Sequence, residues 1–130
     1  MTILDASALL AYLLDEPGAE RVQEALATDA LVGTVNLAEV LSKLADAGED
    51  PEEAMDAIGA LPLELVPFGE DLALESALLR RSTSSAGLSL GDRACLALGR
   101  QLGRPVLTAD RTWPELVPGL EVSVIRGPAT

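Results

Sequence analysis

Short apolar runs alternate with amphipathic segments along the chain, and this alternation constrains the fold more than any other feature. The apolar runs predict strands at residues 2–4, 30–34, 63–68, 105–108 and 121–125. The segments between them have the apolar spacing of helices, at residues 7–14, 19–27, 36–47, 51–61, 70–81 and 90–102. Strands that alternate with helices indicate an α/β domain in which helices cover both faces of a mainly parallel sheet.

Local signals support several of these boundaries. Asp50 and Pro51 mark one helix start, because Asp is a good N-cap and Pro is tolerated at the first helical position. Ser89 is the N-cap of another helix. The Ser- and Thr-rich residues 82–87 predict a loop, and we expect a short helical turn around Trp113.

Composition limits the chemistry that is available. A chain of 130 residues buries roughly 67% of its unfolded surface, so we expect one domain, residues 1–130, that needs no disulfide or structural metal. The sequence has no His, which excludes an imidazole base and His metal ligands. Cys95, the only cysteine, and Trp113 are expected in the core. The 21 Asp and Glu residues remain as candidates for chemistry.

Four acids are predicted to gather at one edge of the sheet. Asp5 and Asp110 follow the first and fourth strands, while Glu39 and Asp92 stand in the first turns of helices that begin near the same edge. A pair of carboxylates ~4 Å apart repels by on the order of 4 kcal/mol at an effective dielectric of 20. A hard cation, Mg²⁺ or Mn²⁺, would relieve that repulsion and support phosphodiester hydrolysis.

Each acid also has a simpler explanation. Asp5 is placed to cap the following helix, and Glu39 to pair with a lysine one turn further along its own helix. Asp92 is three residues after Ser89, which is the spacing of a capping box. Asp110 fits an ordinary turn. The coincidence of all four acids favours a shared site.

The segments that carry these acids resemble the four motifs of the PIN-domain family. They are ILDAS at residues 3–7, TVNLAEV at 34–40, LSLGDRA at 88–94 and LTADR at 107–111. The resemblance covers essentially the whole chain in order, and more narrowly the sequence is similar to VapC-like toxins of type II toxin–antitoxin pairs. It implies a PIN-like three-layer sandwich and a Mg²⁺- or Mn²⁺-dependent endoribonuclease that hydrolyses structured RNA.

The resemblance also implies residue roles and partners. Asp5, Glu39, Asp92 and Asp110 would be the catalytic and metal-binding residues, and Ser7 would support the metal-bound water or the neighbouring carboxylate. The implied assembly is a homodimer with a cognate VapB-like antitoxin, which alone contacts operator DNA. The resemblance assigns no role to Thr34 or Asn36.

A formal net charge of -12 argues against an RNA substrate, but the charge is unevenly distributed. Residues 1–79 contain 17 acids and 2 bases, whereas residues 80–130 contain 7 bases and 4 acids. A local phosphate track is predicted from four arginines that flank the Ser/Thr loop or two of the acids: Arg80, Arg81, Arg93 and Arg111. The acidic N-terminal part suits a basic antitoxin segment.

Two other functions are compatible with the acids. A catalytically silent PIN-like module would use them to bind the arginines of an antitoxin or another basic partner. A phosphoacceptor domain is less compatible, because residues 5–7 lack a second Asp and Lys43 falls inside a helix. No Lys or Arg precedes Ala6, and the uncharged run at residues 6–14 is too short to span a bilayer. We therefore expect a cytoplasmic protein without membrane contact.

Overall fold

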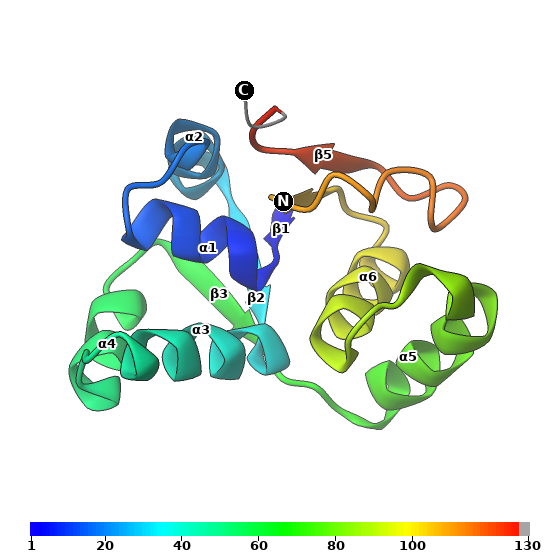
Figure 1. Ribbon diagram of the computed structural model, residues 1–130, viewed down its shortest axis with the longest axis horizontal. Coiled ribbons are helices and arrows are strands. Elements are labelled where there is room, and N and C mark those ends of the chain that lie inside the picture. Colours follow the sequence, from blue (N-terminus) through cyan, green and yellow to red (C-terminus); the bar gives the residue numbers. More distant parts are fainter. Residues whose placement is uncertain (128–130) are drawn as a thin grey trace.

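The computed structural model describes residues 1–127, in which five strands form one parallel sheet (Figure 1). The strand order is β3-β2-β1-β4-β5, and every neighbouring pair is parallel. The strands are β1 (Thr2–Leu4), β2 (Ala30–Gly33), β3 (Leu63–Val66), β4 (Val106–Thr108) and β5 (Val122–Val124). The predicted α/β class with a mainly parallel sheet is confirmed.

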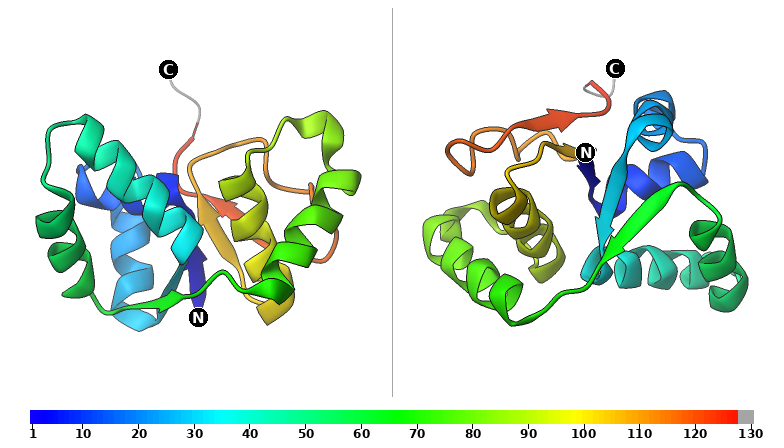
Figure 2. Two further views of the ribbon diagram at one scale, coloured as in Figure 1. Left: turned by 90° about the horizontal axis from the view of Figure 1, so that it is seen from below. Right: turned by 180° about the vertical axis from the view of Figure 1, so that it is seen from behind.

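Helices cover both faces of this sheet, as Figure 2 shows from two further directions. The α-helices of the described residues are α1 (Ala6–Leu13), α2 (Ala19–Thr28), α3 (Thr34–Asp46), α4 (Pro51–Gly59), α5 (Glu70–Ser82) and α6 (Leu90–Leu102). Helices α1 to α4 pack against one face, and α5 and α6 pack against the other. Within residues 1–127, no helix has the length and apolar character needed to cross a membrane.

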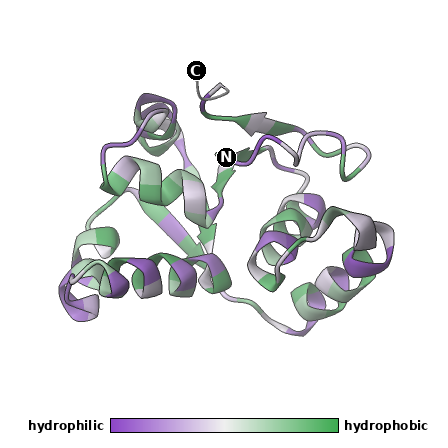
Figure 3. Cartoon of the chain, in the orientation of Figure 1, coloured by the Kyte–Doolittle hydropathy of each residue, from purple (hydrophilic) through white to green (hydrophobic). Residues whose placement is uncertain are grey.

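Side chains of the strands alternate between two cores, as the two-residue period of a strand requires. Leu4 and Leu107 join the core under α1 to α4, whereas Ile3 and Val106 join the core under α5 and α6. Burial on both faces explains why the central strands are continuous apolar runs. In Figure 3, β1 is accordingly coloured as hydrophobic, while α3 and α5 carry both hydrophobic and hydrophilic bands.

Several element boundaries lie one or two residues from the predicted ones, and one segment differs in kind. Helix α3 begins at Thr34, two residues earlier than expected, because Gly33 is extended and leads β2 directly into the helix. The segment around Trp113 forms successive turns instead of a helical turn, and Pro114 and Pro118 lack the amide hydrogens that a helix needs. Trp113 itself is 1% exposed and packs in the core under α5 and α6, as expected.

The predicted helix starts and the buried cysteine are confirmed. Asp50 accepts a hydrogen bond from the Glu52 amide at 2.9 Å, which caps α4. Ser89 is the N-cap of α6, and Cys95 in the same helix is buried. Helix α5 extends to Ser82, the first residue of the predicted loop, and residues 83–89 then join α5 to α6 and include the short 3₁₀ helix η1 (Ser84–Ala86).

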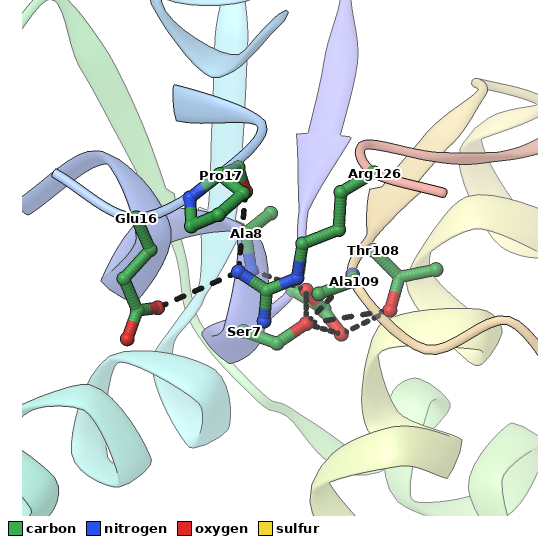
Figure 4. Close-up of polar contacts among 8 residues, drawn as sticks. Ser7, Ala8, Glu16, Pro17, Thr108, Ala109 and Arg126 are labelled. Carbon is green, nitrogen blue, oxygen red and sulfur yellow. Dashed lines mark hydrogen bonds and ion pairs between the residues drawn. The ribbon is translucent and has the colours of Figure 1, made fainter. Parts of the chain in front are cut away.

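The link between α1 and α2 closes over the end of β5. Gly18 has a φ of 96°, and a Cβ there would collide with Ile125, so the turn requires glycine. The Arg126 guanidinium donates to the Pro17 carbonyl at 3.1 Å and lies 3.7 Å from the Glu16 carboxylate (Figure 4). These contacts join the residues that follow β5 to the link between α1 and α2.

The strand order places a topological switch point between β1 and β4. From β1 the chain adds β2 and then β3 on one side, and it returns to the other side of β1 to add β4 and β5. Open parallel sheets bind ligands outside the carboxyl ends of their strands at such a point. The ends of β1 and β4 are therefore the place to look for a site.

Candidate functional site

A cleft of about 200 Å³ opens at the switch point, and all four acids singled out in the sequence line it. Asp5 follows β1, Glu39 comes from α3, Asp92 from α6, and Asp110 from the segment after β4. Four segments that are distant in the sequence therefore contribute one carboxylate each to a single cavity. Ser7 also lines this cleft.

Asp5 forms the buried floor of the cleft and is only 4% exposed. Its Oδ1 accepts hydrogen bonds from the Ala8 amide at 2.8 Å and the Ser7 hydroxyl at 2.7 Å. Its Oδ2 accepts one from the Thr108 hydroxyl at 2.7 Å. Figure 4 shows Ser7, Ala8 and Thr108 gathered at this point. Asp5 is thus the N-cap of α1 and also the link between β1 and β4.

The two hydroxyl groups beside Asp5 are themselves held by the backbone. The Ala109 amide donates to the Ser7 hydroxyl oxygen at 2.9 Å, and the Asp110 amide donates to the Thr108 hydroxyl oxygen at 3.0 Å. Each hydroxyl therefore receives one hydrogen bond and uses its own hydrogen to reach Asp5. The orientation of the Asp5 carboxylate is fixed by tertiary contacts from the end of β4.

Burial raises the pKa of Asp5 from 3.8 to about 6. The hydrogen bonds from Thr108, Ala8 and Ser7 lower the pKa in part, and the negative charge of Asp92 raises it further. The repulsion predicted between the acids is therefore present at the floor of the cleft. A cation bound there would offset both the burial and the repulsion.

The charges of the same acids also affect Cys95, which is buried in the core. Burial raises the pKa of the Cys95 thiol, and the charges of Asp5, Asp92 and Glu39 raise it further. Three of the four carboxylates thus raise the pKa of the same buried thiol. The thiol is buried and its ionisation is opposed, so Cys95 is no candidate for nucleophilic chemistry.

Glu39 is held by Asn36, a residue to which the sequence assigned no role. The Asn36 amide donates to Glu39 Oε1 at 2.8 Å and to the Gly91 carbonyl at 3.1 Å, which joins α3 to α6. Asn36 is 2% exposed. A Cβ at Gly91 would overlap the Glu39 carboxylate, so glycine leaves room for it. The one sequence signal was the three-residue spacing of Asn36 and Glu39 on a helix.

The location of Glu39 corrects one detail of the sequence prediction. Because α3 begins at Thr34, Glu39 lies in the second turn of the helix and not in the first. Lys43 lines the cleft as well, yet within residues 1–127 it forms no ion pair with Glu39. The simple explanation of Glu39 as an exposed helix pair is therefore wrong for this structure.

Asp92 and Asp110 lie at the rim, and each also keeps its local role. Asp92 Oδ2 accepts from the Ser89 amide at 3.0 Å while the Ser89 hydroxyl accepts from the Asp92 amide, which completes a capping box. Asp110 is exposed, and its Oδ1 accepts from the Thr112 amide at 2.9 Å. The local explanations are therefore confirmed for both acids, and both acids also line the cleft.

The donor set of the cleft fits a hard divalent cation by its chemistry. It offers carboxylate and hydroxyl oxygens, which Mg²⁺ and Mn²⁺ prefer, and no imidazole or free thiolate. Among residues 1–127, however, no three acidic side chains converge into a ready ligand shell. Each rim carboxylate accepts a hydrogen bond from a nearby amide through one of its oxygens.

Solved structures with the same fold include several toxin–antitoxin complexes. A toxin–antitoxin complex from Klebsiella pneumoniae has a TM-score of 0.78 and 17% identity, with 97% of this chain and 98% of that chain covered. VapBC2 of Rickettsia felis bound to a promoter DNA fragment has a TM-score of 0.75 and 12% identity, with 95% and 97% covered. FitAcB of Neisseria gonorrhoeae has a TM-score of 0.74 and 18% identity, with 96% and 98% covered.

The family of this chain is identified from its sequence. No curated protein sequence matches the chain. The family model described as the PIN domain matches residues 2–117, which include all four acids of the cleft. The fold, the positions of the acids at the switch point and this match agree, and the chain belongs to the PIN-domain family.

Proposed function

We propose that this chain is a divalent-metal-dependent endoribonuclease that hydrolyses structured RNA as the toxin of a type II toxin–antitoxin pair. The observation that supports it most directly is the gathering of four acids from four separate segments in one cleft of a PIN-domain chain. Nuclease activity is usual for this family, and dense carboxylates need a counter-charge that a cation supplies.

Asp5, Glu39, Asp92 and Asp110 would hold Mg²⁺ or Mn²⁺. When bound, such an ion lowers the pKa of a coordinated water and stabilises negative charge at phosphorus. Hydrolysis forms a bond between the water oxygen and phosphorus and breaks the bond from phosphorus to the 3′ oxygen. The products therefore carry 5′-phosphate and 3′-hydroxyl ends.

The chain's own contribution is to orient these carboxylates before substrate arrives. Ser7 and Thr108 fix the plane of the buried Asp5 carboxylate through hydrogen bonds to both oxygens. Asn36 fixes Glu39 against α6. Rigid placement of such groups reduces the reorganisation that the reaction would otherwise require.

Cleavage of a structured RNA by the purified chain tests the proposal. We expect cleavage with Mg²⁺ or Mn²⁺, none with EDTA, and at least about a hundredfold loss in Asp92→Asn, because removing even supporting groups of a metal site costs 10- to 100-fold. Wild-type turnover in Asp92→Asn would contradict the site. Products that end in 2′,3′-cyclic phosphate would contradict attack by water.

The proposed partners follow from the charge of the chain and from the structures that share its fold. We infer a homodimer that binds a cognate VapB-like antitoxin, whose basic segment enters the acidic cleft and whose other end binds operator DNA. Net charge of -12 and four acids at the cleft favour such a segment. Purification with the product of the adjacent reading frame, followed by light scattering, measures both the complex and the dimer.

A catalytically silent interaction module is the second candidate. It is favoured by the fact that the acids of residues 1–127 form no ready ligand shell. Titration with Mn²⁺ separates the two candidates. The nuclease should give a binding heat that Asp92→Asn reduces, whereas the module should give none.

A further inference from the structure

A second pocket, of about 110 Å³, lies between α5, α6 and the loop that joins them. Its lining residues are Arg80, Thr83, Ser84, Gly87, Leu88 and Arg93, and we call it the arginine pocket. Figure 1 shows α5 and α6 side by side, with the joining loop passing back to the start of α6. Unlike the acidic cleft, this pocket has no carboxylate among its lining residues.

Arg93 lines this pocket, and its guanidinium group is only partly hydrogen-bonded. One of its terminal guanidinium nitrogens donates to the Ser76 carbonyl at 3.1 Å, which ties α6 to α5. Its Nε is buried and has no hydrogen-bond partner among residues 1–127. A buried donor without an acceptor is unfavourable, so the hydrogen bonds of the described chain satisfy the Arg93 guanidinium only in part.

The charge of the pocket is uncompensated as well. The ion pairs found within residues 1–127 join Arg100 to Glu75 and Arg126 to Glu16, so neither Arg80 nor Arg93 is paired there. Two arginines that have no ion pair within residues 1–127 thus line one pocket, which has room for a few water molecules.

Phosphate is the anion that best suits these groups. The planar guanidinium donates two parallel hydrogen bonds to phosphate oxygens, and it is more weakly hydrated than an ammonium group. The hydroxyl-bearing residues Thr83 and Ser84 add polar atoms to the same wall. A metal cation is disfavoured there because both charged residues of the lining are positive.

We propose that the arginine pocket binds a phosphate group of the RNA backbone outside the acidic cleft. The identity of the strand rests on the proposed function. Asp92 lines the cleft and the next residue, Arg93, lines the pocket, so the two sites flank the first turn of α6. A strand whose reacting phosphate lies at the cleft passes these turns and places a further phosphate in the pocket. Local positive charge of this kind offsets the repulsion that a chain of net charge -12 exerts on RNA.

Arg80 and Arg81 offer a matched test. Both are exposed residues of α5, their substitution removes the same charge, and only Arg80 lines the pocket. We would measure binding of a fluorescent single-stranded RNA to the full chain by anisotropy, in EDTA and over a salt series. Arg80→Gln should weaken binding at least fivefold and reduce the salt slope by about 0.7, the value for one phosphate contact of a single strand. Arg81→Gln should change either quantity by less than half as much.

A second measurement uses inorganic phosphate and the Nε–H signal of Arg93 in nitrogen-15 NMR. We expect phosphate to shift this signal in the wild type and not in Arg80→Gln, while the signal of Arg100 stays in place. No shift at Arg93, or equal losses of RNA affinity in Arg80→Gln and Arg81→Gln, would overturn the proposal. Equal losses together with a phosphate shift at Arg93 would show that the pocket takes free phosphate and not the RNA backbone, which also overturns the proposal.

The outcomes separate this proposal from the proposed function. Cleavage that needs Asp92, together with equal RNA affinity in the two arginine variants, overturns the arginine pocket and leaves the nuclease intact. Selective loss of RNA affinity in Arg80→Gln, in a protein that cleaves nothing with Mg²⁺ or Mn²⁺, overturns the nuclease and supports the pocket.

Discussion

The floor and the rim of the acidic cleft hold the same kind of residue in different ways. At the floor, Asp5 is buried and accepts hydrogen bonds from Ser7 and Thr108, the latter from the other side of the switch point. At the rim, Asp92 and Asp110 accept hydrogen bonds from amides three and two residues away. The floor is therefore organised by the tertiary structure, whereas the rim is organised by local turns and remains accessible to a ligand.

The largest effect is expected from Asp5→Asn. Cleavage should fall at least about a hundredfold, because the floor loses its charge. The raised pKa means that ionised Asp5 destabilises the metal-free fold, by up to about 3 kcal/mol for a shift of about two pH units. Wild-type stability should lose this amount as the pH rises from 4 to above 6, and Asp5→Asn should not.

Urea unfolding at several pH values checks this prediction in the metal-free protein. Asp5→Asn should exceed the wild type most above pH 6, and the two should converge at about pH 3 and below, where Asp5 is mostly protonated in both the folded and unfolded states. Asp110→Asn is the matched control, since it removes an exposed charge from the same cleft. A gain of equal size in the control would show that general charge repulsion, and not burial of Asp5, is responsible.

Ser7→Ala should have the next largest effect. It removes a hydrogen bond to Asp5 and leaves the Ala109 amide without its acceptor, so the floor becomes less rigid. We expect Mn²⁺ affinity to fall about 10- to 100-fold, as for other residues that orient metal ligands. Isothermal titration gives the affinity. Unchanged binding would mean that Thr108 and the Ala8 amide orient Asp5 sufficiently.

Gly91→Ala tests whether cleavage depends on the position of the Glu39 carboxylate. The added methyl group would displace the Glu39 carboxylate, which is the flexible end of its side chain, and so weaken the contact with Asn36. We expect about a tenfold loss of cleavage. Stability should change little, because the higher helix propensity of alanine, up to about 1 kcal/mol relative to glycine, offsets the weakened contact between Glu39 and Asn36. Normal activity with a normal melting temperature would exclude a role for the position of Glu39.

Ser89→Ala should have the smallest effect on cleavage and a measurable effect on stability. It removes the hydroxyl that caps α6 and should cost about 1 kcal/mol in thermal or urea unfolding. Asp92→Asn is the opposite case, because the amide oxygen of Asn can still accept from Ser89 while the charge is lost. If Asp92→Asn lost stability and kept activity, the capping role would be the only role of Asp92.

Much of the fold was predictable because it depends on short-range patterns. Apolar runs marked the strands, Asp50 and Ser89 marked helix starts, and alternation of strands and helices indicated the parallel sheet. The turns around Trp113 and the early start of α3 were not predicted, because prolines and an extended glycine overrode the apolar spacing there.

The sequence by itself determined which residues could do chemistry: a chain without His, with acids after two strands and near the starts of two helices, directs carboxylates to one sheet edge. Only the tertiary structure decided which of them is buried and what supports it. Thr108 reaches Asp5 across 103 positions, and Asn36 reaches Gly91 across 55. Such contacts depend on the packing of separate elements against each other, and no local pattern of residues encodes that packing.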